Sequence, residues 1–425
     1  MLDGGVRGGD DEMKRTTFLD VGCSVLLAVL AVLASAAVVA ACASNEDTSS
    51  DTTTDASIVP DASSTGEDAA DAMADASCDA ATENCVTEMA PCESVAWCMV
   101  SANVSVFDVL ASVWGSAPND VWAVGSGGTI LHWDGTTWTR TPSGVKNTFF
   151  RVWGSGPNDV WAVSSTDVIL HGTGFQNGTA SWKPAIPAVS TAAPALVQAM
   201  WGSSSTDLRL GGKAFDLLVE GEGPRKSNQF LSNEGVLGGP WKALAGTFDV
   251  TSIWGSSADD VWMTGDNSKT VQYQRGLIMH GTPAATDAGG EDRLAWTPVE
   301  SQTDVVLEGI WGSSSSDVWA VGALGTIRHY LAGNSRFQEV ASNTRQDLHG
   351  VWASGPNDVW AVGDEGTILH WNGQSFEMSS AQFQIGRKPT LRGVWGSGPN
   401  DVWIVGDGIA LHYTGPKPGA TGEHQ

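Results

Sequence analysis

The sequence predicts an all-β protein, a seven-bladed β-propeller of four-stranded blades, and three observations lead to this prediction. A decapeptide of the form Val-Trp-Gly-Ser-Gly-Pro-Asn-Asp-Val-Trp recurs along the chain, nearly intact at Val152–Trp161, Val351–Trp360 and Val394–Trp403. Its first tryptophan returns at intervals typical of one propeller blade. Each interval holds short runs rich in β-branched and aromatic residues, separated by Gly, Pro, Asn and Asp. The seven leading tryptophans are Trp114, Trp153, Trp201, Trp254, Trp311, Trp352 and Trp395.

The first repeat shows why each blade should have four strands. Ala111–Trp114 and Val121–Val124 flank a segment with Pro, Asn and Asp, which favour a tight turn. Thr129–Trp133 and Thr136–Thr139 follow, joined by an Asp-Gly hairpin signal. An aromatic residue marks the fourth strand of six repeats, and these residues are Trp138, Trp182, Trp241, Trp296, Phe337 and Phe376.

The last repeat ends without a fourth strand, after His412-Tyr413. An unassigned tryptophan, Trp97, precedes the first repeat at a spacing like that between a fourth strand and the next leading tryptophan. A repeat array that does not close leaves bare sheet faces at both ends. We therefore predict that Ala96–Ser101 supplies the missing outer strand of the seventh blade.

The third repeat departs most from the pattern, because Asp207-Leu-Arg209 replaces Asp-Val-Trp and no Gly-Thr-Ile-Leu-His follows. Four segments lengthen this region: Lys183–Val197, Gly221–Pro240, Asp266–Arg275 and Gly281–Arg293. We interpret them as inserted loops, and we expect the fold to tolerate deletion of Gly221–Pro240.

Basic residues gather in the same quarter of an otherwise acidic chain. Loops on a rigid scaffold often carry binding residues, so one hypothesis is a binding surface there for an acidic partner or glycan. The alternative is that the loops are tolerated insertions without a role. The candidate binding residues are Arg209, Lys213, Arg225, Lys226, Lys269 and Arg275, with Lys242 nearby.

The N-terminal part predicts export and a lipid anchor. Residues 1–42 combine a basic start at Met13–Arg15, an apolar run at Ser24–Ala41 and a lipobox-like Val39–Cys42, so Cys42 is the expected lipidation site. An uncleaved membrane anchor is the alternative. Residues 43–77 are rich in Ser, Thr, Asp and Ala, which predicts a disordered acidic tether. The tail 415–425 is predicted to be disordered as well.

Residues 78–95 form a cysteine-rich segment ahead of the propeller at 96–414. Cys78, Cys85, Cys92 and Cys98 have gaps unlike those of paired zinc ligands, and an exported protein favours disulfides. Three connectivities remain open. We expect the bridges to pin the N-terminal segment to the strand that completes the ring.

An Asp and a His recur in the repeats and allow a metal interpretation and a structural one. One Asp per turn supplies few of the oxygens that calcium requires, so we expect its carboxylate to accept backbone amides of the hairpin. Equivalent His residues in different blades should lie too far apart to share a metal, which favours packed histidines. The set comprises Asp120, Asp159, Asp207, Asp260, Asp317, Asp358, Asp401, His132, His171, His280, His329, His370 and His412.

Charge and motifs exclude several functions. A net charge of −26 argues against nucleic-acid partners and against anionic lipid surfaces. No nucleophile, zinc-hydrolase or phosphate-loop motif is present. Tyr273, Tyr330 and Tyr413 lie at or near one repeat position, so they do not suggest a sialidase-like nucleophile. No cofactor or metal is expected.

The pattern VWGSGPNDVWAVG followed by GTILHWDG resembles the repeats of secreted β-propeller lipoproteins abundant in myxobacteria, and is loosely similar to Asp-box and kelch propellers. The resemblance covers residues 96–414 and implies fold and export rather than activity. We expect a monomeric, non-catalytic binding or scaffold module for protein or glycan. It would contact the membrane only through its lipid, at the outer membrane or cell surface. The alternative is a glycan-active hydrolase or lyase using the axial pocket.

Overall fold

The structure is a computed structural model that describes residues 85–185, 190–191, 194–218, 225–232, 241–268, 275–285 and 292–417, all within one compact unit. The predicted signal segment, the tether, Cys42 and Cys78 lie outside the described residues. No helix in the described part of the chain is long and apolar enough to cross a membrane.

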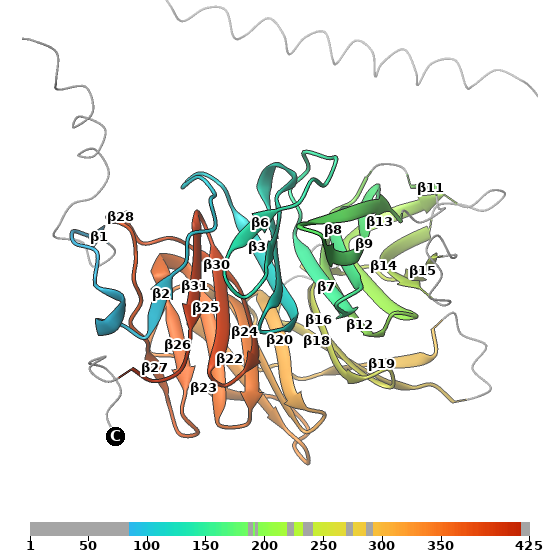
Figure 1. Ribbon diagram of the computed structural model, residues 1–425. Coiled ribbons are helices and arrows are strands. Elements are labelled where there is room, and N and C mark those ends of the chain that lie inside the picture. The colour runs from blue at the N-terminus through green and yellow to red at the C-terminus, as the bar shows by residue number, and fades with distance from the viewer. Residues whose placement is uncertain are drawn as a thin grey trace, which may run out of the picture. The chain divides into compact units, whose positions relative to one another are not determined.

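Seven antiparallel sheets of the described residues are the blades of a β-propeller, and a further two-stranded sheet lies outside the blades (Figure 1). This confirms the predicted fold class. In most blades the order in the sheet follows the order in the sequence, so each blade runs outward from its first strand.

The strands of the first four blades are β3 (Leu110–Ala117), β4 (Asp120–Gly125), β5 (Ile130–Trp133) and β6 (Trp138–Arg140); β7 (Arg151–Gly156), β8 (Asp159–Ser165), β9 (Val168–Gln176) and β10 (Thr179–Pro184); β12 (Val197–Ser204), β13 (Asp207–Leu218), β14 (Arg225–Ser232) and β15 (Trp241–Ala245); β16 (Asp249–Ser257), β17 (Asp260–Asp266), β18 (Leu277–Pro283) and β19 (Leu294–Val299). Those of the last three are β20 (Leu307–Ser314), β21 (Asp317–Gly322), β22 (Thr326–Leu331) and β23 (Gln338–Val340); β24 (Leu348–Gly355), β25 (Asp358–Gly363), β26 (Ile368–Trp371) and β27 (Phe376–Met378); β29 (Leu391–Gly398), β30 (Asp401–Gly406), β31 (Ile409–Tyr413) and β2 (Trp97–Met99).

The seven first strands surround the axis, each in contact with the first strand of the blade on either side, and β29 returns to β3. The packing of the leading tryptophans between neighbouring blades explains the glycine that follows most of them in the repeat. A Cβ atom added to Gly115 would lie 2.6 Å from the ring of Trp395 in the preceding blade. Gly154 stands in the same relation to Trp114, so the glycine that follows six of the seven leading tryptophans gives the neighbouring indole room to pack.

The strand β2 completes the seventh sheet from the N-terminal side. It pairs antiparallel to β31, with Trp97 opposite Tyr413. Its other edge is occupied too, because Trp97 N donates to Ser380 O (3.1 Å) and Gln382 N donates to Trp97 O (2.9 Å). In Figure 1 the blue strand β2 accordingly lies beside the red strand β31. The outer strand therefore leaves no open edge at these residues.

A disulfide joins Cys92 to Cys98, and Cys98 lies within β2. Cys85 is disulfide-bonded as well. Cys85–Val86 forms a short strand, β1, paired with β28 (Gly386–Arg387) in the link between the sixth and seventh blades. The predicted bridge beside the outer strand is thus present, and it ties the preceding 3₁₀ turn η1 (Cys92–Ser94) to that strand.

The third blade corrects one interpretation of the sequence. Residues 221–240 were expected to be a dispensable loop, but they contain β14, which pairs with both β13 and β15. Deleting this segment would remove the third strand of its blade. The short strand β11 (Ser190–Thr191) adds a fifth strand to this sheet by pairing with the end of β13.

Candidate functional site

The recurring Asp and His belong to one side-chain cluster in each of six blades. In the first blade, Asp120 accepts a hydrogen bond from Ser116 Oγ (2.5 Å) and contacts His132 Nε2 (2.8 Å). The indole of Trp122 donates to the same carboxylate (3.2 Å) and packs against the His132 ring. The equivalent Asp–His pairs are Asp159–His171, Asp260–His280, Asp317–His329, Asp358–His370 and Asp401–His412.

These clusters correct the expectation that the aspartate accepts backbone amides, because its partners are side chains. Each cluster joins the first, second and third strands of a single blade. Each imidazole contacts a carboxylate of its own blade. Most of the imidazoles also stack on a tryptophan, as His412 does on Trp403 with 4.0 Å between the ring centroids. The clusters therefore hold strands together within a blade.

We expect these clusters to make the protein sensitive to acid. Burial alone would raise the pKa of Asp401, but hydrogen bonds from His412 and Ser397 bring that pKa below its ordinary value of 3.8. The pKa of Asp120, Asp159, Asp260 and Asp317 is lowered for the same reasons. A carboxyl group whose pKa is lower in the folded state stabilises the folded protein at pH values above its pKa in the unfolded chain. This stabilisation is lost as the pH falls through the pKa of the folded state.

The melting temperature should therefore fall as the pH drops from about 5 to about 2. The variant Asp401→Asn should melt lower at neutral pH and lose less on acidification than the parent chain. Melting curves across that range would check this, and an equal acid response in the two proteins would contradict it.

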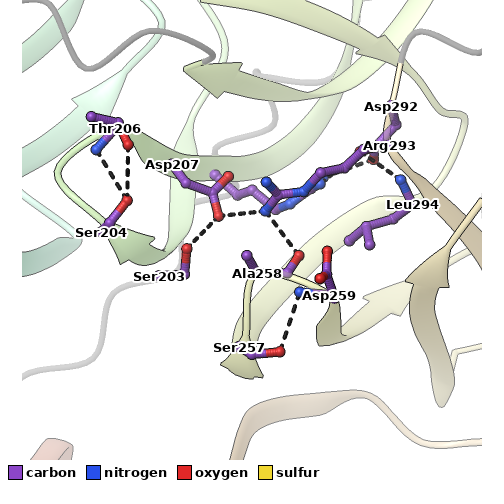
Figure 2. Close-up of polar contacts among 11 residues, drawn as sticks. Ser203, Ser204, Thr206, Asp207, Ser257, Ala258, Asp259, Asp292, Arg293 and Leu294 are labelled. Atoms are coloured by element: carbon purple, nitrogen blue, oxygen red, sulfur yellow. Dashed lines mark hydrogen bonds and ion pairs between the residues drawn. The ribbon is translucent and has the colours of Figure 1, made fainter.

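The third blade has no such cluster and is instead cross-linked to the fourth. Arg209 occupies the position of Trp122, and its register partner is Leu231, where the other blades have histidine. Arg209 donates two hydrogen bonds to Asp292, at 2.8 and 2.6 Å, across the blade boundary. In return, Arg293 donates to Asp207 at 2.6 Å and to Ala258 O at 2.8 Å (Figure 2).

This reciprocal pair of ion pairs, the blade clamp, changes the interpretation of the basic quarter. Arg209 is fully buried beneath Trp296, so it cannot belong to a surface for a ligand. Lys213 and Arg275 are exposed. Arg225 and Lys226 lie in β14, but the structure does not describe their side chains. Lys269 lies outside the described residues. No contact among the described side chains brings the predicted basic residues together.

The axial channel is small and already filled with paired charges. A cavity of about 120 Å³ lies between the first strands, lined by tryptophan, glycine, serine and aliphatic residues together with Arg151, Glu308, His349 and Arg392. Small-molecule sites usually have about 300–1,000 Å³, so this channel is narrow for a sugar ring. Acid and arginine residues do converge here, although no tyrosine is among the lining residues.

His349 bridges two carboxylates at this channel. Its Nδ1 lies 2.7 Å from Glu308 Oε2, and its Nε2 lies 2.9 Å from Asp364 Oδ1. Burial alone would lower the pKa of His349, but the two carboxylates raise it above its ordinary value. Arg392 pairs with Asp407 at 2.7 Å. Glu308, His349 and Arg392 are thus paired within the chain, and Arg151 donates a hydrogen bond to Phe150 O at 2.9 Å.

The candidate binding site is a groove of about 1060 Å³ where the N-terminal segment meets the sixth and seventh blades. Residues 85–87 and 106–107 line one part of it, and the link 384–390 lines another. The turn η4 (Asp364–Gly366) and residues 407–409 contribute the rest. The repeat motif gave no sign of this groove, because much of its lining comes from the N-terminal segment and from the link between the sixth and seventh blades, which lie outside the motif.

Three apolar side chains at the groove are exposed to solvent. Phe107 is 92% exposed, Ile385 is 70% exposed and Val106 is 57% exposed. Soluble proteins rarely leave clustered large apolar side chains in water without a role in binding. The groove therefore fits an interaction surface better than any other feature of the described residues.

No known protein family matches the chain, and no curated protein is similar to it in sequence. The solved structures do contain similar folds. YCF48 bound to D1 peptide superposes with a TM-score of 0.53 at 16% identity, covering 77% of this chain and 99% of that one. YCF48 from Cyanidioschyzon merolae gives 0.54 at 17% identity, covering 75% and 98%. The WD40 propeller domain of Doa1 gives 0.52 at 11% identity, covering 76% and 98%. Likeness at this identity shows the β-propeller fold alone.

Proposed function

We propose that this chain is a non-catalytic binding module, a monomeric β-propeller scaffold that holds a protein partner at the groove beside Phe107. The observation that carries the proposal is this groove, where exposed apolar side chains meet on a rigid frame. Similar propeller folds include one solved with a bound peptide, which supports a protein as the partner class.

The proposal includes an address at the cell envelope. Cys42 follows a lipobox-like sequence, and residues 43–77 would tether the propeller to an outer-membrane or cell-surface lipid. This resembles the arrangement of the secreted repeat lipoproteins described above. Labelling with a fatty acid should mark the parent chain and not Cys42→Ser, and equal labelling would contradict the anchor.

The second candidate is a glycan-active enzyme, favoured by the convergence of Glu308 with Arg151 and Arg392 at the axis. Against it, Glu308 is bonded to His349, and the channel is small. A related candidate is a propeller that binds a glycan without cleaving it, and glycan arrays would test this binding.

A photo-crosslinking amino acid at position 107, in the full-length chain in its cell envelope, would test the main proposal. It should give a discrete protein adduct. The same substitution at Leu331, which is also exposed but lies at the far end of β22 from the turn η3 (Ala323–Gly325), should give none. Glycoside turnover abolished by Glu308→Gln, with no adduct at position 107, would favour the enzyme instead.

A further inference from the structure

We propose that the groove takes an extended, acidic segment of the partner protein. A large apolar side chain of the segment would pack against Phe107, Val106 and Ile385, and its carboxylates would pair with Arg387 and Lys388. This inference rests on the proposed protein-binding function and names the chemistry of the partner.

The exposed apolar side chains of the groove come together from distant parts of the sequence. Val106 and Phe107 precede the first blade, and Ile385 lies in the link between β27 and β29, yet all three line the same groove. Their exposure means that folding gains little from them. An anchor side chain from a partner would bury them, and buried aromatic contacts commonly dominate binding energy.

The pairing of charges at the groove indicates the charge that a complementary partner carries. Asp364 is bonded to His349 and Thr390, and Asp407 is bonded to Arg392. Two of the three carboxylates of the lining are thus paired with basic side chains of the chain, and the third, Glu365, accepts a hydrogen bond from Gln346 Nε2 at 2.7 Å.

In contrast, Arg387 and Lys388 form no ion pair with any residue in the described part of the chain, although the whole chain carries 48 acidic and 22 basic residues. Arg387 is exposed and Lys388 is partly exposed. Cations that remain unpaired in such an acidic chain are complementary to carboxylates of a partner.

The size and backbone of the groove favour a linear segment over a folded domain. Its volume of about 1060 Å³ holds a few side chains. One wall is the extended pair of β1 and β28. A short stretch of chain can follow such a wall and place alternate side chains on the apolar patch and toward the cations.

The test uses the folded protein and an array of fluorescent twelve-residue peptides in which a central Ala, Leu or Phe is flanked by Asp, Ser or Lys. Binding is measured by fluorescence polarisation at low and high salt. The Asp-flanked peptides with Leu or Phe should bind best, and high salt should weaken them. Phe107→Ala should weaken binding by about tenfold or more.

Replacing both cations, Arg387→Ser with Lys388→Ser, should remove the preference for Asp flanks and the salt dependence. Two matched controls should leave binding unchanged: Leu331→Ala, an exposed apolar residue at the opposite end of the strands, and Lys183→Ser, an exposed cation of the second blade. Phe107, Arg387, Leu331 and Lys183 are exposed and Lys388 is partly exposed, so the variants should keep nearly the parent melting temperature.

Equal binding of Asp-, Ser- and Lys-flanked peptides, or unchanged binding by Phe107→Ala, would overturn the inference. If the adduct at position 107 still forms in cells, that result rejects the acidic segment and leaves the protein-binding function standing. Loss of both the peptide preference and the cellular adduct would reject the two together.

Discussion

Replacing Trp97 with alanine should lower the free energy of unfolding by about 3–5 kcal/mol, the usual cost of truncating a buried tryptophan. Its side chain is fully buried, and its ring lies 4.9 Å from that of Trp360 in the sixth blade and 5.3 Å from that of Tyr413 in the seventh. The substitution therefore opens a cavity between two blades at the position where the N-terminal strand joins the last sheet.

The loss should be visible locally as well as globally. Because β2 pairs with β31 through Trp97 and Tyr413, hydrogen exchange of amides in β31 should accelerate before that of the inner strands. Thermal or denaturant unfolding would give the global change.

The matched control is Phe107→Ala, which removes an aromatic side chain that is almost completely exposed. Surface substitutions of this kind change stability by about 0.5 kcal/mol or less. Similar melting curves for the two variants would show that the outer strand contributes little to the stability of the propeller.

The sequence predicted the blades because the repeat encodes local physics. Turn residues and short apolar β-branched runs recur from blade to blade, and a glycine follows six of the seven leading tryptophans; these signals come from residues close together in the chain. The position of Trp97 followed from counting strands, since a sheet with three strands leaves an edge that another segment must cover.

The Asp–His cluster could also have been inferred. His132 follows Asp120 by the same spacing as His171 follows Asp159, which places both side chains on adjacent strands of one blade. The prediction of backbone amides as partners failed because it considered the turn alone and not the third strand.

Two features, the strand β14 and the groove, depend on contacts between residues far apart in the chain, and the repeat motif does not predict such contacts. The strand β14 has the sequence Arg225–Ser232, which lacks the Ile-Leu-His pattern of the third strands in other blades, and its Leu231 lies opposite Arg209, which replaces a tryptophan. The groove combines residues that precede the first blade with the link between the sixth and seventh blades, and only the folded ring brings residues 106–107 to residues 384–390.

The blade clamp gives the second large effect: Asp292→Ala should lower the free energy of unfolding by about 3–5 kcal/mol, because it leaves a buried guanidinium without its counter-ion. Arg209 is fully buried, and both hydrogen bonds to Asp292 would be lost. Asp292 also accepts from the Trp296 indole at 2.9 Å, so the fourth blade loses a contact too.

Two further variants separate charge from packing. Arg293→Ala removes the other half of the clamp, but this side chain is 43% exposed, so its loss should cost only about 0–1 kcal/mol. The double variant Arg209→Met with Asp292→Ala should regain much of the stability lost by Asp292→Ala, since no unpaired buried charge remains. Denaturant unfolding of the four proteins measures these differences. A double variant no more stable than Asp292→Ala would mean that the third and fourth blades depend on the carboxylate's contacts with Trp296 rather than on neutralising Arg209.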